Sequence, residues 1–180
     1  MLLIAKSLDE LRFEELAALY RYDLEVAGCE DGMCELDDDW FLEKRSQFRT
    51  YLSARFFSQP DCLPDIRPFY AIWEEDGRYV SAVRVNVYEQ GLLLEALQTG
   101  EAWRKQGYAT ALVNAVLEYL VQRGGFPVYA HVRNYKAYVH NMLERAGFRK
   151  ILDYAVRKDP CEWPPYYYRE TGFFTYHKQL

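Results

Sequence analysis

The stretch from residue 67 to residue 99 constrains the fold most, because its pattern predicts three consecutive strands joined by two tight turns. Asp76-Gly77 is a dipeptide typical of a type I′ turn, and the second turn is expected near Gly91. The run LLLEAL, residues 92–97, is apolar on both faces, which is typical of a strand in the centre of a sheet. The block therefore predicts an antiparallel three-strand unit that needs cover on both faces.

A strongly amphipathic helix is predicted directly after this block, over residues 105–122. Its apolar side chains recur at steps of three and four, which gives it one sheet-facing side: Ala109, Leu112, Val113, Val116, Leu117, Leu120 and Val121. The pair Gly124-Gly125 is typical of a helix end. PVYAHV, residues 127–132, is predicted to be the next strand. Because a helix crosses between them, the two flanking strands should run parallel.

The remaining elements complete an α/β chain. We expect a strand over residues 2–6, then a helix introduced by a capping box of Ser7 and Glu10, with an apolar stripe of Phe13, Leu16, Ala17, Tyr20 and Leu24. Further helices are expected over 38–57 and 135–146, and closing strands over 148–156 and 172–180. This order predicts a mixed, mostly antiparallel sheet with helices on both faces. No linker or repeat interrupts it, so residues 1–180 are expected to form a single domain.

Composition and charge exclude several classes of function. Half of the 180 residues are hydrophobic, which favours a packed core, and the net charge of −5 argues against a general nucleic-acid partner. No apolar run approaches the roughly 18 residues of a membrane-spanning helix, and the acidic start does not resemble a signal peptide. The residues that could bind zinc lack its spacing, so we expect no metal and free thiols in a cytoplasmic protein: Cys29, Cys34, Cys62, Cys161, His131, His140 and His177.

The start of the helix over 105–122 carries cations next to a glycine. Arg104 and Lys105 precede Gly107, and the free N–H groups of a helix start attract anions. Basic residues at this end oppose the helix dipole and cost a few tenths of a kcal/mol unless an anion is bound. The sequence therefore favours a phosphate site, and a surface helix whose start happens to be basic is the alternative.

The loop fits neither of two common phosphate motifs, since it lacks both G-x-x-x-x-G-K-[ST] and G-x-G-x-x-G. It does fit [QR]-x-x-G-x-[GA], read as residues 104–109. This motif, together with the order of the elements, resembles the GNAT superfamily of N-acetyltransferases over most of the chain. The resemblance implies acetyl-CoA as donor, a primary amine as acceptor and no metal. It also implies these cofactor-binding residues: Leu97, Gln98, Thr99, Arg104, Lys105, Gln106, Gly107, Tyr108, Ala109, Thr110 and Asn134.

In such enzymes the loop N–H groups hold the pyrophosphate, and the strand before the loop pairs with the pantetheine arm. A Glu at the distance of Glu95 often acts as the base. By alternation Glu95 is expected to share a face with Leu93, Leu97 and Thr99, where burial would make its carboxylate a stronger base. Two other roles are open: a carboxylate in a solvated cleft, or one neutralised by Arg84 on the neighbouring strand.

The late part of the chain departs from the superfamily pattern. Asn134 matches an Asn that hydrogen-bonds the cofactor, but the common Tyr that protonates the departing thiolate is replaced by Leu143. Tyr135 and Tyr138 could substitute for it, although packing is the expected role of both. The general acid is therefore open.

Other features leave the acceptor undefined. Acidic residues near the first helices could attract a cationic amine or form a solvated loop: Glu30, Asp31, Glu35, Asp37, Asp38 and Asp39. The aromatic tail over 163–176 could line a substrate pocket or a homodimer contact, with core packing as the default, and His131 is expected to be a core histidine. Two rivals to an acetyltransferase acting by direct attack are a catalytically silent acyl-CoA-binding module and a regulatory subunit.

Overall fold

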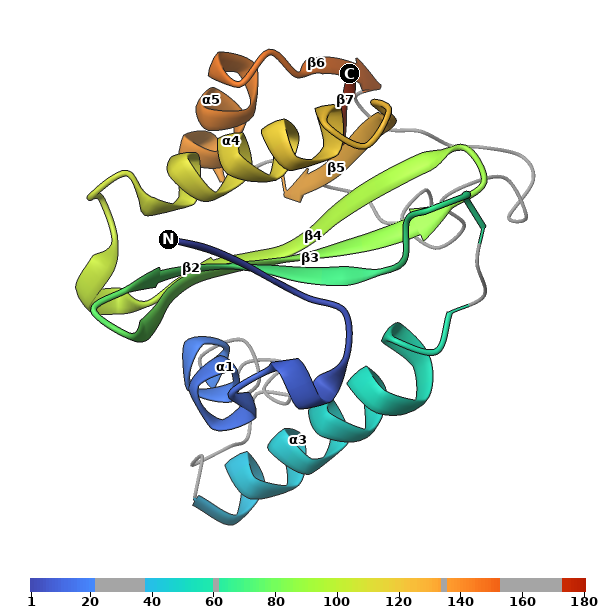
Figure 1. Cartoon of the computed structure of the whole chain (residues 1–180). Coiled ribbons are helices and arrows are strands. Elements are labelled where there is room, and N and C mark those ends of the chain that lie inside the picture. The colour runs from blue at the N-terminus through green and yellow to red at the C-terminus, as the bar shows by residue number, and fades with distance from the viewer. Residues whose placement is uncertain (22–37, 60–61, 134–135, 153–172) are drawn as a thin grey trace.

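A computed structural model of the chain describes residues 1–21, 38–59, 62–133, 136–152 and 173–180 (Figure 1). Its elements follow in this order: β1 (Leu2–Ala5), η1 (Leu8–Glu10), α1 (Phe13–Leu19), α3 (Asp38–Tyr51), η2 (Leu52–Phe56), β2 (Phe69–Glu75), β3 (Arg78–Tyr88), β4 (Gly91–Thr99), η3 (Glu101–Trp103), α4 (Tyr108–Val121), β5 (Pro127–Arg133), α5 (Ala137–Arg145), β6 (Arg149–Leu152) and β7 (Phe173–Gln179).

The seven described strands form one mixed sheet in the order β1-β2-β3-β4-β5-β7-β6. Every neighbouring pair is antiparallel except β4 and β5, which run parallel. Helix α4 connects these two strands, so the predicted crossover and its parallel pair are confirmed. The predicted three-strand unit is β2, β3 and β4. Its first turn has the expected positive φ at both central residues, 48° at Asp76 and 72° at Gly77.

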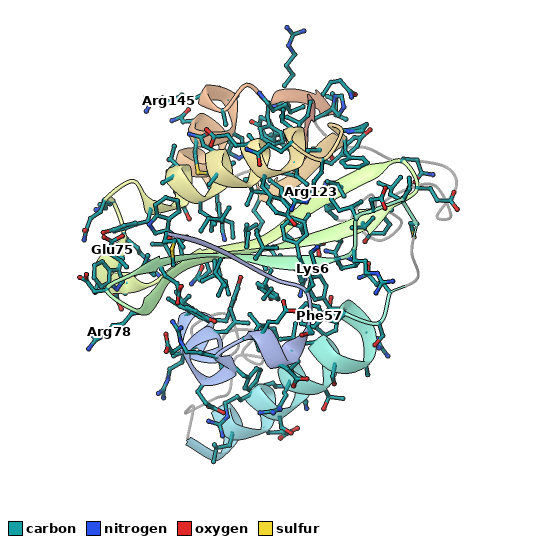
Figure 2. The ribbon with its side chains drawn as sticks, viewed as in Figure 1. Lys6, Phe57, Glu75, Arg78, Arg123 and Arg145 are labelled. Atoms are coloured by element: carbon teal, nitrogen blue, oxygen red, sulfur yellow. The ribbon has the colours of Figure 1, made fainter. Side chains whose placement is uncertain are left out.

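Helices cover both faces of the sheet, as predicted. Figure 1 shows α4 and α5 on one side and α1 and α3 on the other. The α4-side core includes Phe69, Ala71, Val83, Val85, Leu92, Leu94, Leu112, Val116 and Leu120. The α1-side core includes Leu16, Leu52, Phe56, Tyr70, Ile72 and Ala82. Adjacent residues of β2 and β3 thus enter opposite cores, because side chains alternate along a strand. Side chains fill the space between the sheet and both helical layers (Figure 2).

The capping box predicted for the first helix is wrong. Ser7 makes no side-chain cap, and the carboxylate of Glu10 accepts a hydrogen bond from the backbone N–H of Lys6 at 2.7 Å. The residues form only the 3-10 turn η1, and α1 begins later, at Phe13. Its start is fixed by tertiary contacts instead: the Arg12 backbone N–H donates to the Tyr79 hydroxyl at 3.0 Å.

The helix predicted over 105–122 begins three residues later than expected. Lys105 and Gly107 have φ of 63° and 89°, in the left-handed region, so the chain there cannot be α-helical. The helix predicted over 38–57 is confirmed as α3 followed by the π-helical turn η2. The closing strands are confirmed where they are described, as β6 and β7.

Several predictions fall on residues outside the described ranges. These are Tyr22 to Asp37, with most of the acidic run and two cysteines, the pair Asn134-Tyr135, and residues 153–172 with most of the aromatic tail. Cys62 is described, as a half-buried thiol. Within the described ranges, no helix is both long and apolar enough to cross a membrane.

Candidate functional site

The loop between β4 and α4 is folded by its own side chains. After η3, Arg104 Nε donates to the carbonyl of Thr99 at 3.2 Å, and Gln106 Nε2 donates to the carbonyl of Ala102 at 2.9 Å. Lys105 adopts a positive φ, which costs a non-glycine residue about 1–3 kcal/mol. The hydrogen bonds hold the loop in a shape that its sequence alone does not favour.

This shape leaves six consecutive backbone N–H groups, those of residues 105–110, without an acceptor anywhere in the described part of the chain. The first hydrogen bond of α4 runs from the Ala111 N–H to the Gly107 carbonyl at 2.9 Å. Most of these residues are exposed to solvent. An array of free donors at a helix start, next to Arg104 and Lys105, is suited to a multiply charged anion such as a diphosphate.

Gly107 lies at the centre of this array. Its φ of 89° is one that glycine adopts at little cost, and a Cβ added there would meet no atom within 4 Å. The space that a side chain would fill is therefore open next to the free donors. Both properties fit the close approach of a phosphate group to the backbone.

A second set of free backbone groups lies along β4. The parallel ladder between β4 and β5 spans only Leu92 to Leu94, which pair with residues 128–130. Beyond Leu94 no residue of β4 pairs with β5, whereas Gln98 and Thr99 still pair with β3 on the other side. One edge of Leu97–Thr99 is therefore available to an extended ligand, in the way a peptide adds to a sheet edge.

A β-bulge separates this edge from Glu95. Ala96 has a φ of 51°, and the register between β3 and β4 shifts between Ala82 and Arg84. The Tyr20 hydroxyl donates a hydrogen bond to the Ala96 carbonyl, which ties α1 to the bulge. A bulge adds a residue to one strand and so reverses its alternation.

The predicted face of Glu95 is therefore wrong in part. Leu97 packs against the α4-side core, and the Thr99 hydroxyl lies 2.9 Å from that of Ser81. Glu95 instead points with Arg84 and Asn86 towards α3 and η2. Simple alternation failed because it cannot include the extra residue at Ala96.

The carboxylate of Glu95 is buried, with the residue 7% exposed, and is paired. Its Oε2 accepts hydrogen bonds from Asn86 Nδ2 at 2.5 Å and Arg84 Nη2 at 3.1 Å. Asn86 is held in turn by Gln59 Nε2, which donates to its Oδ1 at 3.0 Å. The carboxylate is therefore not surrounded by leucines alone, and the contact with Arg84 that the sequence suggested is present.

Aromatic side chains surround Arg84. Its guanidinium carbon lies 5.0 Å from the ring centre of Tyr51 and 5.8 Å from that of Phe56. Burial alone would lower the pKa of Arg84, but nearby Tyr70, Glu95 and Tyr51 outweigh burial and raise it above the usual value. Burial also raises the pKa of Tyr70 to about 12, so that this hydroxyl stays neutral. Arg84 is therefore a permanent cation beside Glu95.

The residues considered as proton donors to the departing thiolate are not among these partners of Glu95. Leu143 is 2% exposed and belongs to the α4-side core, so the usual tyrosine position is a packing position here. Tyr138 is 70% exposed, which contradicts its expected packing role. Half-buried His131 lies 3.1 Å from the Thr175 hydroxyl through Nδ1. Among the described residues there is no group of three or more potential metal ligands.

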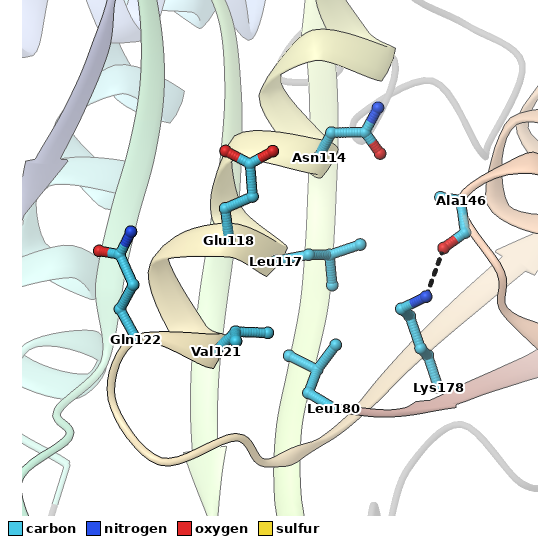
Figure 3. Close-up of a pocket in the computed structure, with 8 residues that line it drawn as sticks. All are labelled: Asn114, Leu117, Glu118, Val121, Gln122, Ala146, Lys178 and Leu180. Carbon is cyan, nitrogen blue, oxygen red and sulfur yellow. Dashed lines mark hydrogen bonds between the residues drawn. The ribbon is translucent and has the colours of Figure 1, made fainter.

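The hollow in Figure 3 lies apart from these residues. It has a volume of about 480 Å³ and is lined by Asn114, Leu117, Glu118, Val121, Gln122, Ala146, Lys178 and Leu180. It lies along the C-terminal half of α4, whereas the free N–H groups are at the start of that helix. None of the predicted site residues contributes to it.

The family's sequence profile matches residues 31–148, more than half of the chain, and its description is "Acetyltransferase (GNAT) family". The chain belongs to the GNAT family of acetyltransferases. It is thus an acyltransferase that uses acetyl-CoA as co-substrate, and the resemblance found in the sequence is confirmed. No functionally curated protein matches the sequence closely enough to count as a relative.

Solved structures of GNAT enzymes share the fold over nearly the full chain. The PaiA N-acetyltransferase of Thermoplasma acidophilum, solved in complex with coenzyme A, has a TM-score of 0.62 at 10% identity, covering 100% of this chain and 99% of that one. A ribosomal-protein-alanine N-acetyltransferase of Brucella melitensis scores 0.60 at 14% identity, covering 99% of each. An aminoglycoside 6′-acetyltransferase of type Ii scores 0.59 at 15% identity, covering 98% and 96%. At such identities the likeness extends to the fold alone.

The residues that sequence reasoning missed are Asn86, Gln59, Tyr20 and Tyr51, all around Glu95. Asn86 was detectable in part, since Arg84 and Asn86 alternate with valines on one strand. Its pairing with Glu95 was not, because this depends on the bulge. Asn134 lies outside the described residues, so its role stays a prediction.

Proposed function

We propose that the chain is a single-domain N-acetyltransferase that transfers the acetyl group of acetyl-CoA directly to a primary amine. The observation that carries the proposal is the row of free N–H groups over residues 105–110, which continues from the unpaired edge of β4. One pattern of free donors suits a diphosphate, and the adjacent edge suits an extended chain. Acetyl-CoA has both parts.

In this proposal the chain binds its co-substrate with backbone groups. The N–H groups from Lys105 to Thr110 hold the diphosphate, and Arg104 and Lys105 add positive charge. The edge over Leu97 to Thr99 pairs with the pantetheine arm. Bound acetyl-CoA supplies an acyl group that is activated by its thioester. Backbone N–H groups near Leu97 stabilise the oxyanion that forms during attack.

Glu95 is the proposed base. Its carboxylate is buried on β4, next to the bulge that separates it from Leu97. It removes a proton from the acceptor ammonium directly or through one water molecule, and a positioned base of this kind contributes about 10²–10⁴-fold to the rate. Leu143 has no proton to donate, so the proton for the departing thiolate comes from another group or from water.

Acetyl-CoA turnover, followed as free thiol, tests the proposal on a panel of amines. The panel includes a peptide with a free α-amine, an N-blocked lysine peptide, a polyamine and an aminoglycoside. We expect turnover with at least one of them. Coenzyme A binding without turnover on a broad panel would instead indicate a silent binding module, and absence of binding would refute the cofactor site.

The substitution Glu95→Gln tests the base separately. It keeps the size of the side chain and its acceptor oxygen, so coenzyme A affinity measured by calorimetry should not change. Turnover should fall by about 100-fold or more. Retention of full turnover would show that another group removes the proton.

A further inference from the structure

A buried polar cluster extends beyond the proposed base. We define the Glu95 cluster as Arg84, Asn86 and Glu95, with Gln59 and Tyr51 in contact with it. The donors from Arg84 and Asn86 both reach the same carboxylate oxygen, Oε2. Two donors on one oxygen fix the rotation of the carboxylate more firmly than one does.

The guanidinium of Arg84 is held by contacts with α3 and η2 and not by solvent. Arg84 has a side chain that is 17% exposed, and its Nε is buried without a hydrogen-bond partner among the described residues. Tyr51 and Phe56, from α3 and η2, lie on its guanidinium. The position of Arg84 therefore depends on the aromatic residues that pack against the sheet.

A buried pair of this kind contributes little net stability, because removing two charges from water offsets most of their attraction. Its larger effect is on the orientation of the partner. The hydrogen bond from Arg84 Nη2 fixes Oε2 of Glu95 from the side of β3. The contact thus bears on the chemistry of Glu95 more than on folding.

We propose that Arg84 is a positioning residue that holds the carboxylate of Glu95 in the orientation in which it accepts a proton. This inference rests on the proposed function of Glu95. The other groups that face the pair are Tyr70 of β2, Tyr51 of α3, Tyr20 just after α1 and, further out, exposed Arg55 of η2. Burial raises the pKa of Tyr70 and of Tyr51, so neither hydroxyl ionises near neutral pH.

The test is to measure kcat and KM at about pH 7.5, with a single amine acceptor, for the wild type, Arg84→Met and Arg84→Lys. One acceptor and one pH are used throughout so that the protonation of the acceptor is common to all variants. Arg84→Met removes the cation and keeps a stem that packs on Tyr51. Its kcat should fall by about tenfold or more, because the base is no longer held in position, with KM for acetyl-CoA unchanged.

Arg84→Lys restores the charge without the two-pronged geometry of arginine. Its kcat should lie between those of the wild type and Arg84→Met, because a charged donor is restored and the orientation is not. If Arg84→Met does not fold, the Lys variant still decides the matter: a wild-type kcat would overturn the role in positioning.

Arg12→Met is the matched control. Arg12 is also paired with carboxylates, Glu15 and Glu74, and its guanidinium carbon lies 4.2 Å from the ring centre of Tyr79, but neither carboxylate belongs to the Glu95 cluster. This variant should lose stability and keep the wild-type kcat. The same fall in kcat in both variants would overturn the proposal, because it would indicate a general effect of lost charge.

Failure of the inference can be told apart from failure of the proposed function. If Glu95→Gln retains turnover, the base is misassigned and Arg84 loses its proposed role with it. If Glu95→Gln loses turnover while Arg84→Met keeps the wild-type kcat, the base stands and only the role of Arg84 is refuted.

Discussion

The loop over residues 104–110 and the Glu95 cluster differ in where their polar groups find partners. The loop has six backbone N–H groups with no acceptor among the described residues, and solvent reaches most of it. The Glu95 cluster is buried, and its carboxylate, amide and guanidinium groups bind one another. Free donors that the chain itself does not satisfy point to a ligand. A buried cluster whose polar groups bind one another points to control of a reacting group.

The two regions should also respond differently to substitution. Because the loop acts through its backbone, glycine and φ angles matter more there than the identity of most side chains. Because the cluster acts through side chains, single substitutions within it should alter turnover and leave cofactor affinity intact. Three variants separate these two kinds of dependence.

The largest effect is expected from Gly107→Ala, compared with Gly77→Ala. Both glycines have positive φ, and a Cβ added to either meets no atom within 4 Å. Both variants should therefore lose a similar amount of stability, about 1–2 kcal/mol. Only Gly107→Ala should weaken coenzyme A binding, by tenfold or more, because its Cβ enters the space proposed for phosphate. Calorimetry and thermal unfolding measure the two quantities. Equal affinities in the two variants would remove the main support for the phosphate site.

An intermediate effect is expected from Tyr20→Phe. The change leaves the Ala96 carbonyl without its hydroxyl donor and should cost about 0.5–1.5 kcal/mol of unfolding free energy. Turnover should fall several-fold, because the bulge next to Glu95 and Leu97 is held less firmly, while coenzyme A affinity is retained.

Tyr79→Phe is the control for this change. The Tyr79 hydroxyl accepts a hydrogen bond from the Arg12 backbone N–H, at the end of β3 that joins the β2–β3 hairpin. It should lower stability to a similar extent with normal turnover. If both variants retain full turnover, the bond between Tyr20 and the bulge has no catalytic consequence.

The smallest effect is expected from Glu15→Gln, at a site that serves neither region. Hydrogen bonding to Arg12 and to the Tyr79 backbone N–H, opposed by partial burial, holds the pKa of Glu15 below its usual value. The unfolded chain therefore binds this proton more readily. The stabilisation is present above the unfolded pKa, near 4.3, and is lost as pH falls through the lower folded value.

Because Glu15 is 39% exposed at its side chain, the contribution should stay below about 1 kcal/mol. Urea unfolding at pH 3 and pH 7 should show a smaller difference in stability for Glu15→Gln than for the wild type. Turnover at pH 7 should be unchanged. An equal pH dependence in both proteins would show that this ion pair contributes nothing measurable.

Much of the fold could be predicted from the sequence, because periodicity and turn dipeptides are local signals. The hairpin at Asp76-Gly77, the central strand and the crossover helix with its parallel strands were all predicted correctly. The loop motif was recognised for the same reason, since six adjacent residues carry it.

The errors have one cause, which is dependence on distant residues. Ser7 and Glu10 have the right spacing for a capping box, but the start of α1 is set by contacts with the β2–β3 hairpin. The environment of Glu95 depends on the bulge at Ala96, which no local pattern marked. Tyr138 fits an amphipathic helix, yet the side on which it lies is exposed.

The early end of the ladder between β4 and β5 has a consequence for the whole molecule. Within the described ranges, three ladder pairs of β4 with β5 join the strand block β1–β4 to the block β5–β7–β6. A pantetheine arm along the free edge would extend this short junction with new hydrogen bonds. Saturation with coenzyme A would then slow amide hydrogen exchange in β4 and β5. Binding of the co-substrate would thus also strengthen the connection between the two blocks of the sheet.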